Sequence, residues 1–158
     1  SYFASSAVNS LKWKGPGSLD FWDRVSYVQQ LLVARKLNER FSLEINPTYV
    51  HRNMVDTELD PNDVWAIGGC ARFKITRRFS LNAEYYYIIP PRHDFQSVET
   101  FNPLSFGVDI ETGGHVFTIL LTNSLAMIEK GFIGETTGTW KDGGIHLGFN
   151  ISRVFALK

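Results

Sequence analysis

Histidines are the first side chains to consider for catalysis, and the chain has four of them: His51, His93, His115 and His146. None forms an H-x-x-x-H or HExxH pair, so the spacing typical of a zinc enzyme is missing. A histidine on a polar strand face, near Ser152 or Asp109, could still build a hydrolase triad. No G-x-S-x-G elbow supports that arrangement, and we predict no catalytic residue.

An acidic loop is the second candidate for chemistry. The stretch "DTELDPND", residues 56–63, carries Asp56, Glu58, Asp60 and Asp63. Oxygen ligands at such spacing suit calcium, but the glycine and the terminal glutamate of an EF-hand loop are missing. A solvated acidic loop explains the stretch as well, and we expect neither a bound metal nor a cofactor.

Polar side chains at alternating positions form the third candidate set. They are Glu44, Asn46, Arg72, Lys74, Asn82, Glu84, Asp109, Glu111, His146 and Asn150. Counting back from tight turns places Glu44 near Arg72. The same count places Glu84 opposite Asp109, and two facing acids need a cation, for which Arg72 is the candidate. We predict that this set lines the interior of a barrel, with an ordinary solvated sheet face as the alternative.

Strands must position these residues, because the apolar pattern has a period of two. In "RFSLEINPTYV", residues 40–50, the side chains of Phe41, Leu43 and Ile45 share one face, and Glu44 lies on the other. The same alternation predicts eight strands, at about residues 2–13, 23–37, 40–52, 63–75, 79–89, 104–111, 115–122 and 145–156. The faces of the second strand are ambiguous. The sequence therefore predicts an all-β protein whose sheet has one apolar face and one polar face.

The connections between these strands alternate strictly between short and long. Those at 38–39, 76–78 and 112–114 are tight, whereas those at 14–22, 53–62, 90–103 and 123–144 are long. Outer-membrane barrels have short periplasmic turns and long outer loops. The pattern favours an antiparallel up-and-down barrel with the C-terminus on the short-turn side.

Composition agrees with a single β-rich domain. The chain has 158 residues, 16 basic and 16 acidic side chains, and 14% aromatics. The even balance of charge gives no field that would favour nucleic acid. The single cysteine, Cys70, excludes an internal disulfide. No apolar run is long enough for a transmembrane helix. No signal sequence opens the chain, so the protein is either cytoplasmic or has lost a signal peptide. Because the opening "SYFASSAVNSLKWK" already reads as a strand, we expect further strands upstream.

Aromatic residues gather near the ends of the expected strands, as in the interfacial girdles of membrane barrels. They are Trp13, Phe21, Trp22, Trp65, Phe73, Phe79, Tyr85 to Tyr87 and Phe155. The rims of a soluble barrel would carry a similar pattern. The closing "ISRVFALK" resembles the final strand of outer-membrane barrels, although three residues follow Phe155.

The last long connection contains a short apolar repeat at helical spacing. Leu125, Ile128 and Phe132 recur within "TNSLAMIEKGFIGETTG", where Ser124 could cap a helix and Gly131 could end it. We predict a short helix that either enters the barrel as a plug or packs on its rim.

Several stretches together carry a family resemblance: "RVSYVQQLLVARKLNERFSLEINPTYVHRN", "SLNAEYYYIIP", "GVDIETGGHVF", "LTNS", "MIEKGFIGETTG" and "HLGFNISRVFALK". From about residue 21 to the end, the chain resembles the C-terminal part of an uncharacterised family of bacterial outer-membrane β-barrel proteins of unknown function. The resemblance implies a barrel that can hold more strands than this chain supplies. It implies no activity and no catalytic residue.

We therefore predict a non-enzymatic, porin-like β-barrel of the bacterial outer membrane. It would act as a structural or scaffold component or as a small-solute channel, with lipids and other outer-membrane proteins as partners. Two alternatives stay open. A soluble, lipocalin-like carrier would turn its apolar face inward around a ligand, and an outer-membrane hydrolase would need a serine and a histidine on one polar face.

Overall fold

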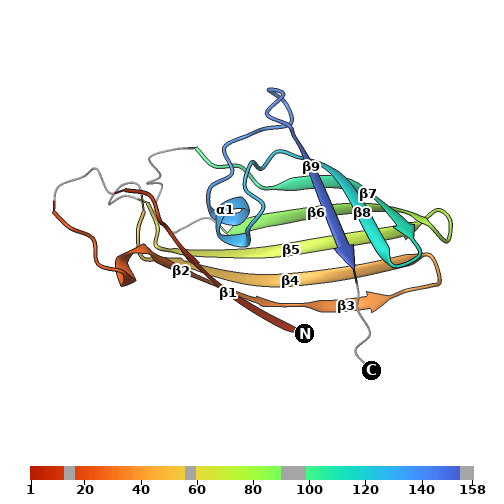
Figure 1. Ribbon diagram of the computed structural model, residues 1–158, viewed down its shortest axis with the longest axis horizontal. Helices are drawn as coiled ribbons and strands as arrows, with labels where there is room; N and C mark the ends of the chain where they lie inside the picture. Colours follow the sequence, from red (N-terminus) through yellow and green to blue (C-terminus); the bar gives the residue numbers. More distant parts are fainter. Residues whose placement is uncertain (13–16, 56–59, 90–98, 154–158) are drawn as a thin grey trace.

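The computed structural model describes residues 1–12, 17–55, 60–89 and 99–153 (Figure 1). The described elements are β1 (Tyr2–Val8), η1 (Trp22–Arg24), β2 (Val25–Leu31), β3 (Val33–Lys36), β4 (Phe41–Arg52), β5 (Asp63–Lys74), β6 (Phe79–Ile89), β7 (Leu104–Thr112), β8 (His115–Thr122), α1 (Glu129–Gly134) and β9 (His146–Arg153). Every ladder between strands is antiparallel. The prediction of an all-β, antiparallel fold is confirmed.

The strands form one curled sheet in the order β1-β2-β4-β5-β6-β7-β8-β9, with β3 beside β4 (Figure 1). Neighbours in the sheet are neighbours in the chain, as the up-and-down prediction requires. In the described part of the chain, no ladder joins β1 to β9. The sheet is therefore a half-barrel whose concave side holds α1.

The predicted second strand, 23–37, is two strands, because Leu32 separates β2 from β3. Of these two, only β2 also pairs with β1. The first strand is shorter than predicted, because β1 ends at Val8 and residues 9–12 are not in a strand. The remaining boundaries lie close to the predicted ones, and the end predicted near residue 156 lies outside the described residues.

Short turns join the strands at one end of the sheet, as predicted. Gly113 and Gly114 have φ of 48° and 136° and make a two-residue hairpin turn. In the turn before β4, Asn38 Oδ1 accepts hydrogen bonds from the backbone of Arg40 and Phe41. Such side chain to backbone bonds favour a turn over continued extension. The long connections lie at the opposite end.

The exposure of the two faces of the sheet shows whether the apolar face points outward or into the interior. On the convex side, Ile45 and Trp65 keep 55% and 56% of their surface exposed. On the concave side, Asn46 and Thr48 are buried. A lipocalin-like carrier would bury the apolar face, so this exposure disfavours the alternative of a soluble carrier. The apolar surface faces outward, where a bilayer would cover it.

Aromatic side chains mark both ends of this convex surface. Tyr49 and Trp65 pack together near the long loops, with ring centroids 4.6 Å apart. Phe41 and Phe73 face each other in the ladder near the short turns. Tyr86, predicted in the girdle, is buried on the concave side, because its even position in β6 points inward. Trp13 and Phe155 lie outside the described residues.

A small apolar core fills the long-loop end of the concave side. It contains Val28, Val50, Val64, Ala66, Tyr86 and Ile133. Ile133 comes from α1, so this core joins the helix to the wall of the sheet. No helix in the described part of the chain is long and apolar enough to cross a bilayer.

Spin labels at two neighbouring positions test the assignment of faces. We expect a label on Leu43→Cys to be accessible to oxygen, which concentrates in lipid, because Leu43 lies on the convex surface. A label on Glu44→Cys should favour a water-soluble nickel reagent. Both labels are placed in a Cys70→Ser background, in protein reconstituted into bilayers. Equal oxygen accessibility at the two positions would contradict the assignment.

Candidate functional site in the concave face

The residues predicted to line a barrel interior lie on the concave face. Strand alternation and ladder register place them on the same side as the buried Asn46 and Thr48. Asn150 is exposed there because β9 is the last strand of the sheet. That these residues line a closed lumen stays a prediction.

Arg72 of β5 reaches across β6 to two carboxylates of β7. Its Nη2 lies 3.4 Å from Asp109 Oδ2 and 3.7 Å from Glu111 Oε1. From β8, Thr118 Oγ1 donates a hydrogen bond to Asp109 Oδ1 at 2.8 Å. The prediction that Arg72 is the cation beside Asp109 is confirmed.

The predicted position of Glu84 opposite Asp109 is wrong. In the ladder between β6 and β7, Glu84 faces Ser105, and Asp109 faces Ser80. A tight turn fixes register by its length, whereas β6 and β7 are joined by the long connection 90–103. Counting residues along the chain could not give this register.

A chain of polar contacts crosses the concave face from β2 to β6. Gln30 Nε2 donates to Thr48 Oγ1 at 3.0 Å and to the hydroxyl of Tyr86 at 3.3 Å. Asn46 Nδ2 donates to the same hydroxyl at 3.3 Å and to Cys70 Sγ at 3.5 Å. In the described part of the chain, the amide oxygen of Asn46 has no hydrogen-bond donor. Unfilled acceptors are costly in a buried site.

Glu84 extends this chain through its contacts with Cys70 and Tyr86. The thiol of Cys70 donates to Glu84 Oε1 at 3.5 Å. Glu44, predicted near Arg72, faces Cys70 directly and is only a diagonal neighbour of Arg72. Among the described residues, no cation lies within ion-pair distance of Glu84. In the described part of the chain, the carboxylates of Glu44 and Glu84 therefore lie on the concave face without an ion-pair partner.

The helix α1 enters the concave side as a plug of the long-loop end. Ile133 is fully buried, and the ring of Phe132 lies 5.3 Å from that of Tyr86. The helix contacts β2, β4 and β5 (Figure 1). A Cβ on Gly131 would clash with Ala126, so a glycine is needed where the chain folds back to start the helix.

Three details of the predicted helix are wrong. The helix begins after Ile128, which caps it without a side-chain hydrogen bond, and Gly131 lies inside it. Leu125 and Ile128 are exposed, and Ser124 donates instead to the carbonyl of Ala126. The apolar contact comes from Phe132 and Ile133, so the helical spacing in the sequence identified only one of the two packing residues.

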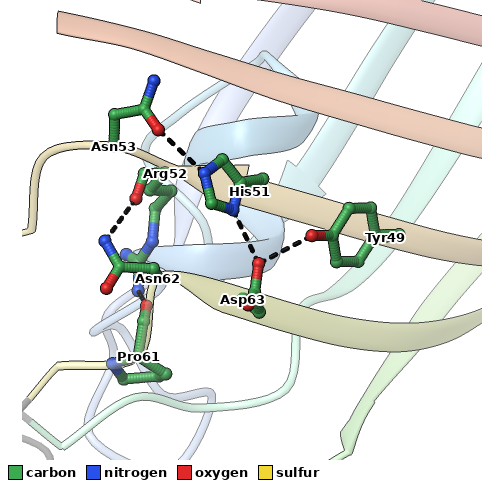
Figure 2. A network of polar contacts seen from close by, with 7 residues as sticks. All are labelled: Tyr49, His51, Arg52, Asn53, Pro61, Asn62 and Asp63. Carbon is green, nitrogen blue, oxygen red and sulfur yellow. Dashed lines mark hydrogen bonds and ion pairs between the residues drawn. The ribbon is translucent and has the colours of Figure 1, made fainter. Parts of the chain in front are cut away.

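Arg52, at the end of β4, ties the plug to the neighbouring loop (Figure 2). Its side chain is buried, and Nη2 donates to the carbonyl of Pro61 at 2.8 Å. Nη1 donates to the carbonyl of Gly134, at the end of α1, at 3.3 Å. Asn62 Nδ2 closes the loop by donating to the carbonyl of Arg52 at 2.6 Å. One guanidinium thus holds β4, the loop before β5 and α1.

The outer side of the same rim carries a histidine between two oxygens (Figure 2). His51 Nδ1 lies 2.6 Å from Asp63 Oδ1, and Nε2 lies 2.8 Å from Asn53 Oδ1. Asn53 Nδ2 donates to the carbonyl of Trp22, which fixes the orientation of the amide. Both ring nitrogens therefore face acceptors, and the ring makes both bonds only when it carries two protons.

Asp63, one of the four acidic residues considered as calcium ligands, is engaged by protein side chains. It accepts a hydrogen bond from Tyr49 at 2.7 Å in addition to its contact with His51. Asp56 and Glu58 lie outside the described residues. Within the described ranges, no three His, Cys, Asp or Glu side chains are grouped so that they could hold a metal ion.

The remaining histidines lie apart from one another. His115 begins β8 after the glycine turn and faces Arg153, whereas His146 begins β9 and faces Thr122 at the other end of the ladder. His93 lies outside the described residues.

A cavity of about 130 Å³ lies beneath α1. Its polar wall comes from Glu84, Tyr86, Ser105, Thr122 and Ser124, and its apolar wall includes Leu120, Met127 and Phe132. Of these residues, only Glu84 was assigned to the interior from the sequence, and Tyr86, Ser124 and Phe132 were given other roles. Strand alternation could have placed Tyr86 and Ser105 on the concave face. The lining residues of the long connection after β8, such as Ser124 and Met127, follow no strand periodicity that would reveal them.

The whole chain was then compared with known proteins. Residues 1–155 match the model of a family described as a membrane bound beta barrel domain, DUF5777. The chain belongs to this family. The DUF5777 match covers β1 and the first loop as well, so the relationship extends further toward the N-terminus than the resemblance from residue 21 implied. No curated protein and no solved structure matches the chain.

Membership in DUF5777 agrees with the exposed apolar surface of the half-barrel. The family description names a membrane-bound barrel domain, and the convex side carries the apolar residues that such a domain presents to lipid. The protein is therefore a membrane β-barrel protein.

Proposed function

We propose that the protein is a non-enzymatic, structural component of the bacterial outer membrane, whose interior is closed at the long-loop end by α1. The observation that carries this proposal is the complete burial of Ile133 against the inner wall of the sheet. A plug held by an apolar core and by Arg52 favours a barrel that is shut at rest. Small solutes would pass only after α1 moves.

The short turns would face the periplasm and the long loops the outside, as is usual in such barrels. Lipid would cover the convex surface between the two aromatic ends. Within the described residues, no strand pairs with the outer edges of β1 and β9. These edges would need partners, because lipid satisfies no backbone hydrogen bond. Further strands of the same polypeptide, or another outer-membrane protein, would supply them.

Conductance across planar bilayers tests the plug. We expect the wild-type protein to give little steady current. Ile133→Asp places a charge in the apolar core, which is strongly unfavourable, so α1 should leave and the current should rise. Ile128→Asp is the matched control, because Ile128 precedes the same helix and is 53% exposed. It should behave like the wild type.

Two results would contradict the proposal. A large steady current through the wild-type protein would show an open channel. An equal rise in both variants would show that burial of Ile133 is unrelated to closure. Circular dichroism of each variant confirms that the sheet is still folded.

A further inference from the structure

We propose that the cavity beneath α1 binds a small organic cation, a primary ammonium group on a short alkyl chain. The inference goes beyond the proposed structural role and does not require that the barrel conduct. It depends on the charge, the hydrogen-bonding groups and the shape of the cavity wall.

Glu84 supplies the reason for a cation. Its carboxylate lines the cavity and accepts hydrogen bonds from two neutral groups, the thiol of Cys70, a weak donor, at 3.5 Å and the hydroxyl of Tyr86. The charged groups whose field acts on Glu84 are two further carboxylates, Glu44 and Glu129. The nearby guanidinium of Arg72 is already engaged by Asp109 and Glu111. A partly buried carboxylate among other acids is stabilised by a bound cation.

The cavity also offers the acceptors that an ammonium group needs for its three N–H donors. Ser105 Oγ donates to Thr122 Oγ1 at 2.9 Å, so the Ser105 oxygen keeps lone pairs to accept with. Ser124 Oγ donates to the carbonyl of Ala126 and likewise stays an acceptor. A carboxylate and two hydroxyl oxygens in the lining of one cavity suit a primary ammonium.

The cavity also has apolar lining that suits a short alkyl chain. Phe132, Met127 and Leu120 belong to this lining, and the rings of Phe132 and Tyr86 lie 5.3 Å apart. Aromatic faces attract organic cations. A divalent metal ion would need several carboxylate or carbonyl ligands at once, and the described residues group no such set. An anion would meet the charge of Glu84.

Methionine methyl groups report binding directly, since the chain has only two methionines. Met127 lines the cavity, whereas Met54 follows β4 and is not among the lining residues. The full chain, labelled with ¹³C at the methionine methyls and reconstituted in nanodiscs, is titrated with n-propylammonium chloride. We expect a saturable shift of the Met127 signal and a constant Met54 signal. The same concentrations of n-propanol, which lacks the charge, should leave Met127 unshifted.

Two charge variants decide the role of the carboxylate. Glu84→Gln keeps the size of the side chain and should weaken binding at least tenfold, whereas Glu84→Asp should keep part of the affinity. Glu111→Gln is the matched control, because Glu111 is a concave-face acid already paired with Arg72, and it should bind like the wild type. Unchanged methyl signals without ligand show that each variant is folded.

Three results would overturn the proposal: no shift of Met127 in the wild type, the same shift with n-propanol, or undiminished affinity in Glu84→Gln. None of them depends on conductance. The conductance experiment tests whether the barrel is closed, and the methionine titration tests whether the ammonium site exists. Either proposal can therefore fail while the other holds.

Discussion

A Gly68→Val protein is expected to lose about 2 kcal/mol of folding free energy, the usual cost of overpacking. Gly68 faces Tyr86 in the ladder between β5 and β6. The phenol ring lies against the glycine, and a Cβ there would be 2.7 Å from Tyr86 Cζ. The ring cannot move away freely, because its hydroxyl accepts from Gln30 and Asn46.

The adjacent glycine provides the control for this variant. Gly69 points to the convex side, and a Cβ there would meet nothing within 4 Å. Gly69→Val should therefore be close to neutral. Urea unfolding in detergent, followed by the gel mobility of the folded barrel, measures both. Equal destabilisation of the two variants would mean that the Tyr86 contact is not the cause.

An Arg72→Met protein is expected to be destabilised by about 3 kcal/mol, because it leaves the carboxylate of Asp109 buried without its cation. The side chain of Asp109 is only 13% exposed. Its remaining partner, the hydroxyl of Thr118, compensates only part of the charge. The same unfolding experiment measures the loss.

A second substitution tests whether the loss comes from the stranded charge. Asp109→Asn in the Arg72→Met background removes that charge and should restore most of the stability, as double-mutant cycles require for coupled sites. Lys74→Met is the control, because Lys74 is the next residue of β5 on the same face and forms no ion pair among the described residues. It should change stability little. A double variant no more stable than Arg72→Met would contradict the explanation.

The fold was predictable because its main signals are local. Alternation in residues such as Phe41, Leu43 and Ile45 gives both the strand and its apolar face. Tight turns give the ends, and the alternation of short and long connections gives the order of the strands. The outward direction of the apolar face follows from the same pattern once a bilayer is assumed.

The candidate site was predictable only in part, because it depends on contacts across long connections. The register of Glu84 against Ser105 is set by packing across the sheet and not by a turn. The place of Ile133 is set by the valines that it meets in β2, β4 and β5, and no local pattern specifies them. The pairing of Arg72 with Asp109 was predicted correctly, because strand alternation places both side chains on the same face of the sheet.

The contacts of Arg52 have a consequence for how the long-loop end of the barrel opens. Its guanidinium bonds at once to the loop before β5, through Pro61, and to the end of α1, through Gly134. Neither segment can separate from the wall without breaking bonds that the other shares. Segments coupled in this way unfold as one cooperative unit, so the rim and the plug should exchange their amide protons together. The opening of this end of the barrel is then a single event with a single free energy.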